Sequence, residues 1–241
     1  MNRRVMLFGA GVVVIGLLIV VVVVVYPLLA GGSGEASAPI SAPDLTPQSA
    51  GATMFQIVPE ESEVRFILTE DLFGQPTTVT GSTNQVTGEI AVDTVNPSNS
   101  QVGTIIVNAR TLTTDNEFRN RAIRTYILES ARDEFEFSQF TPTAIQGLPE
   151  SVADLALGQA VTFQITGNLT VRNITSPVTF DVTVTPVSET RLEGSAAATV
   201  QRSSFELTIP NVPNVANVSE EVRLEIDFVA VAVGQDQESE S

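Results

Sequence analysis

The chain contains no cysteine, histidine, tryptophan or lysine, and each absence excludes a class of chemistry. Without cysteine there is no disulfide framework and no thiolate nucleophile. Without histidine and cysteine, zinc and haem sites lose their usual ligands. The Ser-His-Asp triad and the commonest general base are excluded as well. We therefore expect no such metal site, no cofactor and no catalytic residue.

Positive charge is also scarce, and the net charge is −16 with a pI near 4.2. This negative field repels phosphate backbones, so nucleic acid is not expected as a partner. Carboxylates would suit a hard metal such as calcium, but the sequence has no Asp-rich loop of the EF-hand type.

One long apolar run opens the chain. It extends from about Val5 to Leu29 and follows two arginines. A bilayer core needs about 20 apolar residues, so the run predicts a transmembrane anchor within residues 1–30. The arginines place the N-terminus in the cytoplasm and the rest of the chain outside. A cleaved signal peptide is the alternative, although its apolar region normally has about 7–15 residues.

Two segments without core-forming residues flank the predicted domain. Residues 31–53 are rich in Gly, Ser, Ala and Pro, which predicts a disordered linker with a mean span on the order of 25–30 Å. Residues 234–241 form an acidic tail. The folded domain is therefore expected to cover residues 54–233.

Between these segments apolar and polar residues alternate, as in strands with one buried face. The clearest runs are residues 161–172, 177–186 and 221–231. One wet face and one dry face imply an antiparallel sheet. Many such strands joined by short turns imply a barrel or a sandwich, with about eight strands.

The stretch TLTTDNEFRNRAIRTYILES, residues 111–130, breaks this alternation. A capping-box pattern is followed there by three apolar residues at helical spacing. The capping-box residues are Thr114 and Glu117, and the apolar residues are Phe118, Ala122 and Tyr126. We expect a helix of roughly residues 115–128 that lies across the sheet or closes one end of a barrel.

Another strand, residues 191–201, carries three very small residues on one face: Gly194, Ala196 and Ala198. Two interpretations remain open. The small residues pack closely against a bulky neighbour, or they leave volume for a ligand. An eight-stranded barrel is just wide enough to hold one small ligand.

Five segments, taken in order along the chain, resemble one known family. They are VTGSTNQVTGEIAVD (79–93), LTTDNEFRNRAIRT (112–125), FEFSQFTPT (135–143), GNLTVRNITSPV (167–178) and VQRSSFEL (200–207). Together they are similar to the YceI-like family over about residues 55–233. The resemblance implies a lipocalin-like barrel that binds polyisoprenoids and other lipids.

The sequence departs from the family pattern at three positions. Asn120 stands where the family usually has Asp, Ala122 where it has His, and Glu206 where it has Gly. Any contact that the family's Asp or His makes to a ligand is therefore lost. A chain without histidine also supplies no imidazole to haem.

Arg119 and Arg124 match arginines of the family's helix, whereas Arg121 has no clear counterpart. A guanidinium suits phosphate and carboxylate, so Arg119 and Arg124 are candidates for binding a lipid headgroup at a cavity mouth. The structural alternative is that these arginines pair with nearby carboxylates or bind loop carbonyls.

The alternation also predicts which side chains would touch a ligand, and the helix adds two more. The candidate ligand-binding residues are Phe66, Leu68, Phe118, Tyr126, Phe163, Ile165, Leu169, Phe180, Val182, Ala196, Ala198 and Phe228. The strand residues among them would point inward in a filled barrel as well.

These observations predict an all-β, antiparallel, eight-stranded lipocalin-like barrel with one short helix and an N-terminal transmembrane helix. We expect a periplasmic or cell-surface carrier, not an enzyme, that holds an isoprenoid or fatty-acyl lipid for storage, shielding or transfer. The expected partners are an amphipathic lipid and the membrane, and the oligomeric state is open. Two alternatives remain: a filled barrel or sandwich that binds another envelope protein, and an enzyme that uses paired carboxylates on glycans.

Overall fold

The structure is a computed structural model and describes residues 36–37, 40–150 and 156–233. Its strands are β1 (Thr53–Ile57), β2 (Glu63–Leu72), β3 (Gln75–Thr83), β4 (Val86–Thr87), β5 (Glu89–Val92), β6 (Gln101–Val102), β7 (Ile105–Asn108), β8 (Phe137–Gln146), β9 (Val161–Val171), β10 (Ile174–Ser188), β11 (Arg191–Gln201), β12 (Val215–Ala216) and β13 (Glu221–Ala232). Its helical segments are η2 (Pro59–Glu61), η3 (Pro97–Asn99), η4 (Ala109–Thr111), α3 (Glu117–Ala122), the π-helix η5 (Ile123–Ile127), η6 (Asp133–Phe135) and η8 (Arg202–Phe205).

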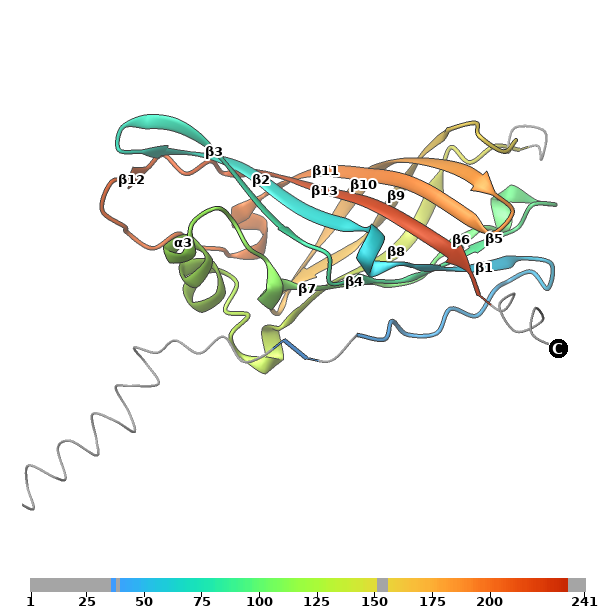
Figure 1. Cartoon of the computed structure of the whole chain (residues 1–241), viewed down its shortest axis with the longest axis horizontal. Helices are drawn as coiled ribbons and strands as arrows, with labels where there is room; N and C mark the ends of the chain where they lie inside the picture. The colour runs from blue at the N-terminus through green and yellow to red at the C-terminus, as the bar shows by residue number, and fades with distance from the viewer. Residues whose placement is uncertain (1–35, 38–39, 151–155, 234–241) are drawn as a thin grey trace, which may run out of the picture.

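These strands form one strongly curled antiparallel sheet (Figure 1). The order β7-β8-β9-β10-β11-β13 makes most of the wall, and β13 then pairs with β2 and β1. The segment β3-β4-β5 completes the circuit, because β3 pairs with β2, β4 with β7 and β5 with β1. The predicted all-β antiparallel class is confirmed.

The predicted number of about eight strands is wrong, because the described residues form thirteen. Several long alternating stretches of the sequence form two or more separate strands, because the chain bends within them. The helical turn η2 separates β1 from β2, and short breaks separate β3, β4 and β5. The alternation of apolar and polar residues detects these stretches, but it does not show where the backbone leaves the hydrogen-bonded ladder.

The inward faces of the long strands follow the predicted alternation. Ile165 of β9 lies opposite Phe180 of β10, and Phe163 lies opposite Val182. Ile165 and Val182 are buried in a core cluster with Phe140 of β8. Burying such side chains contributes about 1.5–3 kcal/mol each.

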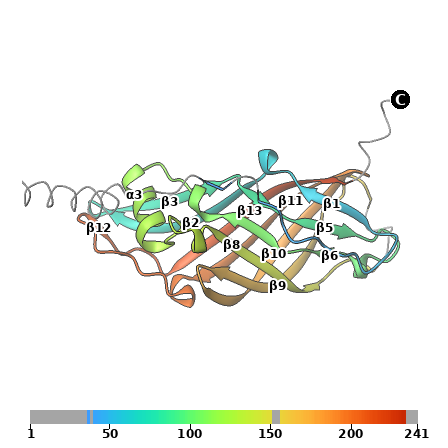
Figure 2. The ribbon, with the colours of Figure 1, turned by 90° about the horizontal axis from the view of Figure 1, so that it is seen from below.

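The two ends of the barrel differ (Figure 2). We call one of them the mouth end, where both views place the β2–β3 turn, α3 and β12. The other is the far end, where β5 and β6 lie. Toward the far end a second core cluster contains Phe55, Ile57, Val86, Leu192, Phe228 and Ala230.

The predicted helix exists, but its first turn and its buried face differ from the prediction. The Asn116 side chain caps it by accepting hydrogen bonds from the backbone N–H groups of Phe118 and Arg119, at 2.9 and 3.1 Å. The capping box of Thr114 and Glu117 is not formed. The Thr114 hydroxyl instead donates to the Asn120 side chain at 2.7 Å.

The buried residues of this helical segment are Asn120 and Ile123, not the predicted apolar stripe. Asn120 is held inward by Thr114, and Arg119 is held by an ion pair with Glu70 of β2. These polar contacts set the rotation of the helix and leave Phe118 and Tyr126 largely exposed.

Part of the predicted linker lies along the barrel wall and has no regular secondary structure; we call residues 36–37 and 40–52 the strap. Ser37 donates two hydrogen bonds to Glu136, at 2.7 and 2.6 Å. The Leu45 N–H donates to Glu89, and the Gln48 N–H donates to Gln101. Glu136 directly follows η6, which Figure 1 shows on the same side of the barrel as α3, so the strap runs from the mouth end toward β1.

The predicted transmembrane anchor and the acidic tail lie outside the described residues. Within the part of the chain that is described, no helix has the length and apolar character needed to cross a membrane.

Candidate functional site

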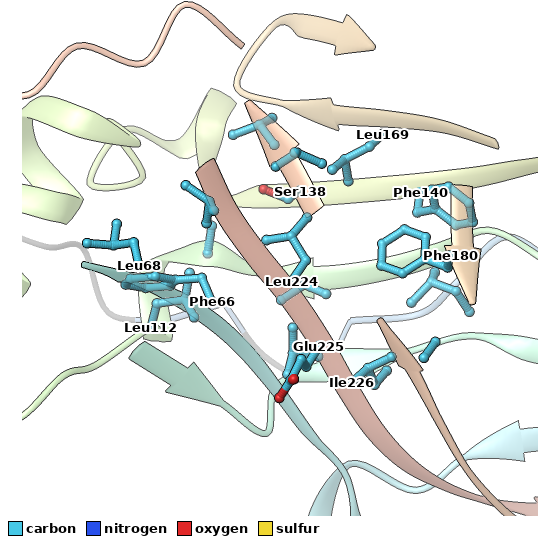
Figure 3. A pocket seen from close by; sticks show the side chains of 18 of the residues that line it. Phe66, Leu68, Leu112, Ser138, Phe140, Leu169, Phe180, Leu224, Glu225 and Ile226 are labelled. Atoms are coloured by element: carbon cyan, nitrogen blue, oxygen red, sulfur yellow. The ribbon is translucent and has the colours of Figure 1, made fainter. Parts of the chain in front are cut away.

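The barrel encloses a cavity of about 670 Å³. Its wall consists mainly of apolar side chains from β2, β7 to β11 and β13. Figure 3 shows Phe66, Leu68 and Leu112 gathered on one side, Phe140 and Phe180 on another, and Leu224 between them. Ligand pockets in proteins typically measure about 300–1,000 Å³, so this volume suits a small apolar molecule.

Most of the candidate residues lie in this wall. The ones that line the cavity are Phe66, Leu68, Phe118, Arg119, Phe163, Ile165, Leu169, Phe180, Val182, Ala196 and Phe228. The strand residues reach the cavity because alternation puts them on the concave face of the sheet.

Three candidates do not line the cavity: Tyr126, Ala198 and Arg124. Tyr126 is exposed on η5, since the helix is rotated by the contacts of Asn120 and Arg119. Ala198 faces inward but is covered by the core cluster that contains Phe205. Arg124 lies on η5 and makes no side-chain hydrogen bond or ion pair with the described residues.

The small residues of β11 combine the two interpretations that the sequence left open. A Cβ at Gly194 would come within 2.7 Å of the Phe228 ring, so this position is small because a bulky neighbour packs on it. Ala196, two residues later, lines the cavity and leaves volume there.

An ion pair stands in the cavity wall beside the helix. The Arg119 guanidinium contacts Glu70 at 2.8 Å and Asp115 at 2.6 Å. The Glu70 side chain is 8% exposed. The positive charge of Arg119 is therefore already matched by carboxylates, which supports the structural interpretation of this residue.

Sequence reasoning missed Glu70, although a signal was present. The alternation that places Phe66 and Leu68 inward places Glu70 on the same face, where an acidic residue is out of pattern. A charge on a dry face requires a partner, and Arg119 supplies it.

Arg202 of η8 was also missed as a cavity residue. Its guanidinium donates to the Leu207 carbonyl at 2.7 Å and pairs with Glu220 at 2.8 Å. Its Nε–H is buried and has no acceptor among the described residues.

The mouth end is where the cavity approaches solvent. Phe73 of the β2–β3 turn, Phe118 of α3 and Val212 of the loop before β12 all line the cavity and are all exposed. The Phe73 N–H donates to the Asn214 carbonyl at 2.8 Å, which joins the turn to that loop.

Two solved structures show the same fold at low sequence identity. A polyisoprenoid-binding domain from Saccharophagus degradans, implicated in plant cell wall breakdown, is 15% identical, with a TM-score of 0.57 over 74% of this chain and 98% of that one. Burkholderia cenocepacia BcnA is 17% identical, with a TM-score of 0.55 over 73% of this chain and 99% of that one. No curated protein matches the chain by sequence.

A family model also matches the chain, over most of the described barrel. The model is that of the YceI-like domain, and it matches residues 55–230. This range contains the helix, the cavity lining and all of the strands except the first two residues of β1 and the last two residues of β13. The chain therefore belongs to the YceI-like domain family.

Proposed function

We propose that this protein holds one long apolar molecule, a polyisoprenoid or a fatty-acyl lipid, inside its barrel for storage, shielding or transfer. The observation that carries the proposal is the apolar cavity of about 670 Å³, open near the helix. Membership of the YceI-like domain family and the fold shared with a polyisoprenoid-binding domain support it.

Burial of hydrocarbon supplies the binding energy. Each methylene removed from water contributes about 0.8 kcal/mol, so about 15 buried methylenes contribute about 12 kcal/mol before the costs of association. Such binding needs no catalytic group.

The charged side chains of the cavity lining are already paired, Glu70 with Arg119 and Arg202 with Glu220. The lining therefore favours the apolar part of a ligand. Binding of an anionic headgroup by Arg119 and Arg124 stays a separate prediction, because Arg119 already pairs with two carboxylates.

We further propose that the apolar run of residues 5–29 anchors the chain and that the barrel lies outside the cytoplasm. The support is the length of the run and the two arginines before it.

The alternative of a filled barrel is disfavoured by the cavity, which leaves part of the interior unfilled. An acid–base site is likewise not favoured. The two carboxylate residues of the described lining, Glu70 and Glu225, are both ion-paired with arginines.

Native mass spectrometry followed by organic extraction tests the proposal. The shortened chain should begin at Gly31, so that it keeps the strap, and should be purified without detergent. We expect a co-purified lipid of defined mass, or uptake of added prenyl or fatty-acyl lipid. A folded protein that carries no lipid and takes none up would refute the carrier function.

The matched variants are Ala196→Phe and Ala197→Phe. Ala196 lines the cavity, whereas Ala197 is adjacent on the same strand and is not part of the wall. We expect Ala196→Phe to reduce lipid uptake at least about tenfold, because the phenylalanine ring fills space that the hydrocarbon chain of the lipid needs. Ala197→Phe should retain lipid uptake.

A further inference from the structure

The exposed aromatic side chains of the described residues gather at the mouth end. Phe118 is 88% exposed, Phe73 is 73% exposed and Tyr126 is 62% exposed. Large apolar side chains exposed elsewhere are valines and a leucine: Val95, Leu157, Val187, Val231 and Val233. Phenylalanine side chains are usually buried, so a group of exposed ones at a cavity mouth indicates a surface that contacts a partner.

Phe73 occupies a backbone position that disfavours it. Its φ is 52°, followed by Gly74 at 75°, which is the backbone of a tight hairpin turn that prefers Asn-Gly. A bulky residue with positive φ is an outlier. The fold therefore places a phenylalanine ring in solvent at a position where asparagine would suit the turn better.

Phe118 is presented just as firmly. Asn120 and Ile123 are buried beneath the helix, and Arg119 is tied to Glu70 of β2. These contacts hold one face of the helix against the barrel. The other face, which carries the Phe118 ring, is therefore turned toward solvent.

The exposed residues are continuous with the cavity. Phe73, Phe118 and Val212, which we call the rim, line its opening and come from three elements joined by the Arg119–Glu70 and Phe73–Asn214 contacts. A surface that contacts the rim therefore also covers the opening.

We propose that the mouth end docks onto the surface of a lipid bilayer, with the rim entering the interfacial region so that the cavity opens directly to membrane lipid. The proposal rests on the carrier function, because it supplies the route by which a lipid enters. Phenylalanine is among the residues with which interfacial segments bury an apolar face at the boundary between headgroups and acyl chains.

The strap orients the barrel for this contact. Ser37 is hydrogen-bonded to Glu136 at the mouth end, so residues 30–36 alone separate Ser37 from the apolar run that ends at Leu29. Seven residues span at most about 25 Å. A strand of twelve residues such as β13 is about 40 Å long, so a membrane anchor would hold the mouth end, not the far end, against the bilayer.

Apolar insertion, rather than charge, drives the docking. The chain carries a net charge of −16, and at the mouth end Arg119 is neutralised by Glu70 and Asp115. Docking should therefore occur on zwitterionic phosphatidylcholine and should weaken little between 50 and about 500 mM salt, because screening acts on charges and not on buried rings.

The absence of tryptophan makes the test direct, since each variant carries a single tryptophan, whose emission can be excited apart from that of the two tyrosines. The full chain is reconstituted in phosphatidylcholine vesicles with and without brominated acyl chains. The variants are Phe73→Trp, Phe118→Trp and, as a far-end control, Val95→Trp. We expect bromine to quench the tryptophans at positions 73 and 118 at least threefold more than the one at position 95. Equal quenching at both ends, or none at the mouth end, would overturn docking.

Two further variants are combined with the tryptophan at position 118. Phe73→Asn suits the turn, so the fold should be kept while quenching falls at least twofold. Ala196→Phe fills the cavity, so lipid uptake should fall while quenching persists. Loss of quenching in Ala196→Phe would show that the fluorophore reports lipid in the cavity, which overturns docking and leaves the carrier function standing. Quenching by vesicles in a protein that takes up no lipid would overturn the carrier function alone.

Discussion

Phe228, toward the far end, is 8% exposed, whereas Phe118, at the mouth end, is 88% exposed. The first ring packs over Gly194 with Phe55, Leu192 and Ala230 around it. The second ring stands in solvent on a helix held by polar contacts. The packing around Phe228 therefore stabilises the barrel toward the far end, whereas the mouth end leaves apolar surface available for contact.

The largest effect should come from truncating the packed ring. We expect Phe228→Ala to lower the free energy of unfolding by about 3–5 kcal/mol, because it leaves a cavity over Gly194. Phe118→Ala should change it by less than about 0.5 kcal/mol. Urea unfolding followed by circular dichroism measures both, and similar losses at the two positions would contradict the division between the ends.

The second prediction concerns the polar cluster that fixes the strap at the mouth end. Glu136 and Arg110 are 2% and 3% exposed, and their side chains are 3.3 Å apart. Removing one partner of a buried pair costs about 3–5 kcal/mol, but Arg110 also pairs with Asp133, so we expect Glu136→Gln to cost about 2–3 kcal/mol.

Glu89→Gln is the matched control for this prediction. Glu89 accepts a hydrogen bond from the strap at Leu45, and glutamine would still accept one. We expect a loss below about 1 kcal/mol for this partly exposed site. Proteolysis of the strap should accelerate in Glu136→Gln more than in Glu89→Gln, and the reverse order would contradict the role given to Ser37 and Glu136.

Acid should weaken the same attachment. Burial by itself raises the pKa of Glu136, but hydrogen bonds from Ser37 and Asn108 and the charge of Arg110 outweigh it, so its pKa lies below the ordinary value of 4.5. The ionised form therefore stabilises the fold above that value, and the stabilisation is lost as pH falls through the lowered pKa. The difference in unfolding free energy between wild type and Glu136→Gln should shrink from pH 7 to about pH 3. A constant difference would refute the linkage.

Phe73→Asn should have a smaller effect, of the opposite sign. Asparagine tolerates the positive φ of this turn, and its backbone N–H can still donate to Asn214. We expect a gain in unfolding free energy of about 1 kcal/mol, measured by urea unfolding. A clear loss would show that the exposed ring stabilises the fold.

The far end and the long strands could be predicted from sequence because alternation there is sustained. Over eleven residues of β9, period two allows one buried face, and Ile165 and Leu169 lie on it. The pattern also contained Glu70, but a carboxylate on an apolar face was not recognised without the partner, Arg119, which lies 49 residues away in sequence.

The mouth end could not be predicted in the same way. The α-helix α3 has six residues, too few for apolar spacing to decide which face is buried. Its orientation depends on the Thr114–Asn120 hydrogen bond and the ion pair with β2, and hydrophobic periodicity does not detect such contacts. Composition likewise does not show the single hydrogen bonds by which the strap contacts the barrel.

The smallest expected effect concerns the headgroup prediction at the mouth end. Arg124 has no ion-pair partner among the described residues and lies outside the cavity wall, so its charge would act on an anionic headgroup only through partly screened attraction. We expect Arg124→Gln to weaken binding of a prenyl phosphate about threefold and to leave binding of the neutral prenyl alcohol unchanged, with stability altered by less than about 0.5 kcal/mol. Arg119→Gln is less informative, because it also leaves the Glu70 carboxylate without its partner. The test is to measure the Kd values of the two lipids at low and high salt. If the ratio of the prenyl phosphate Kd to the prenyl alcohol Kd is the same in the folded Arg124→Gln variant as in the wild type, Arg124 is not part of the headgroup site.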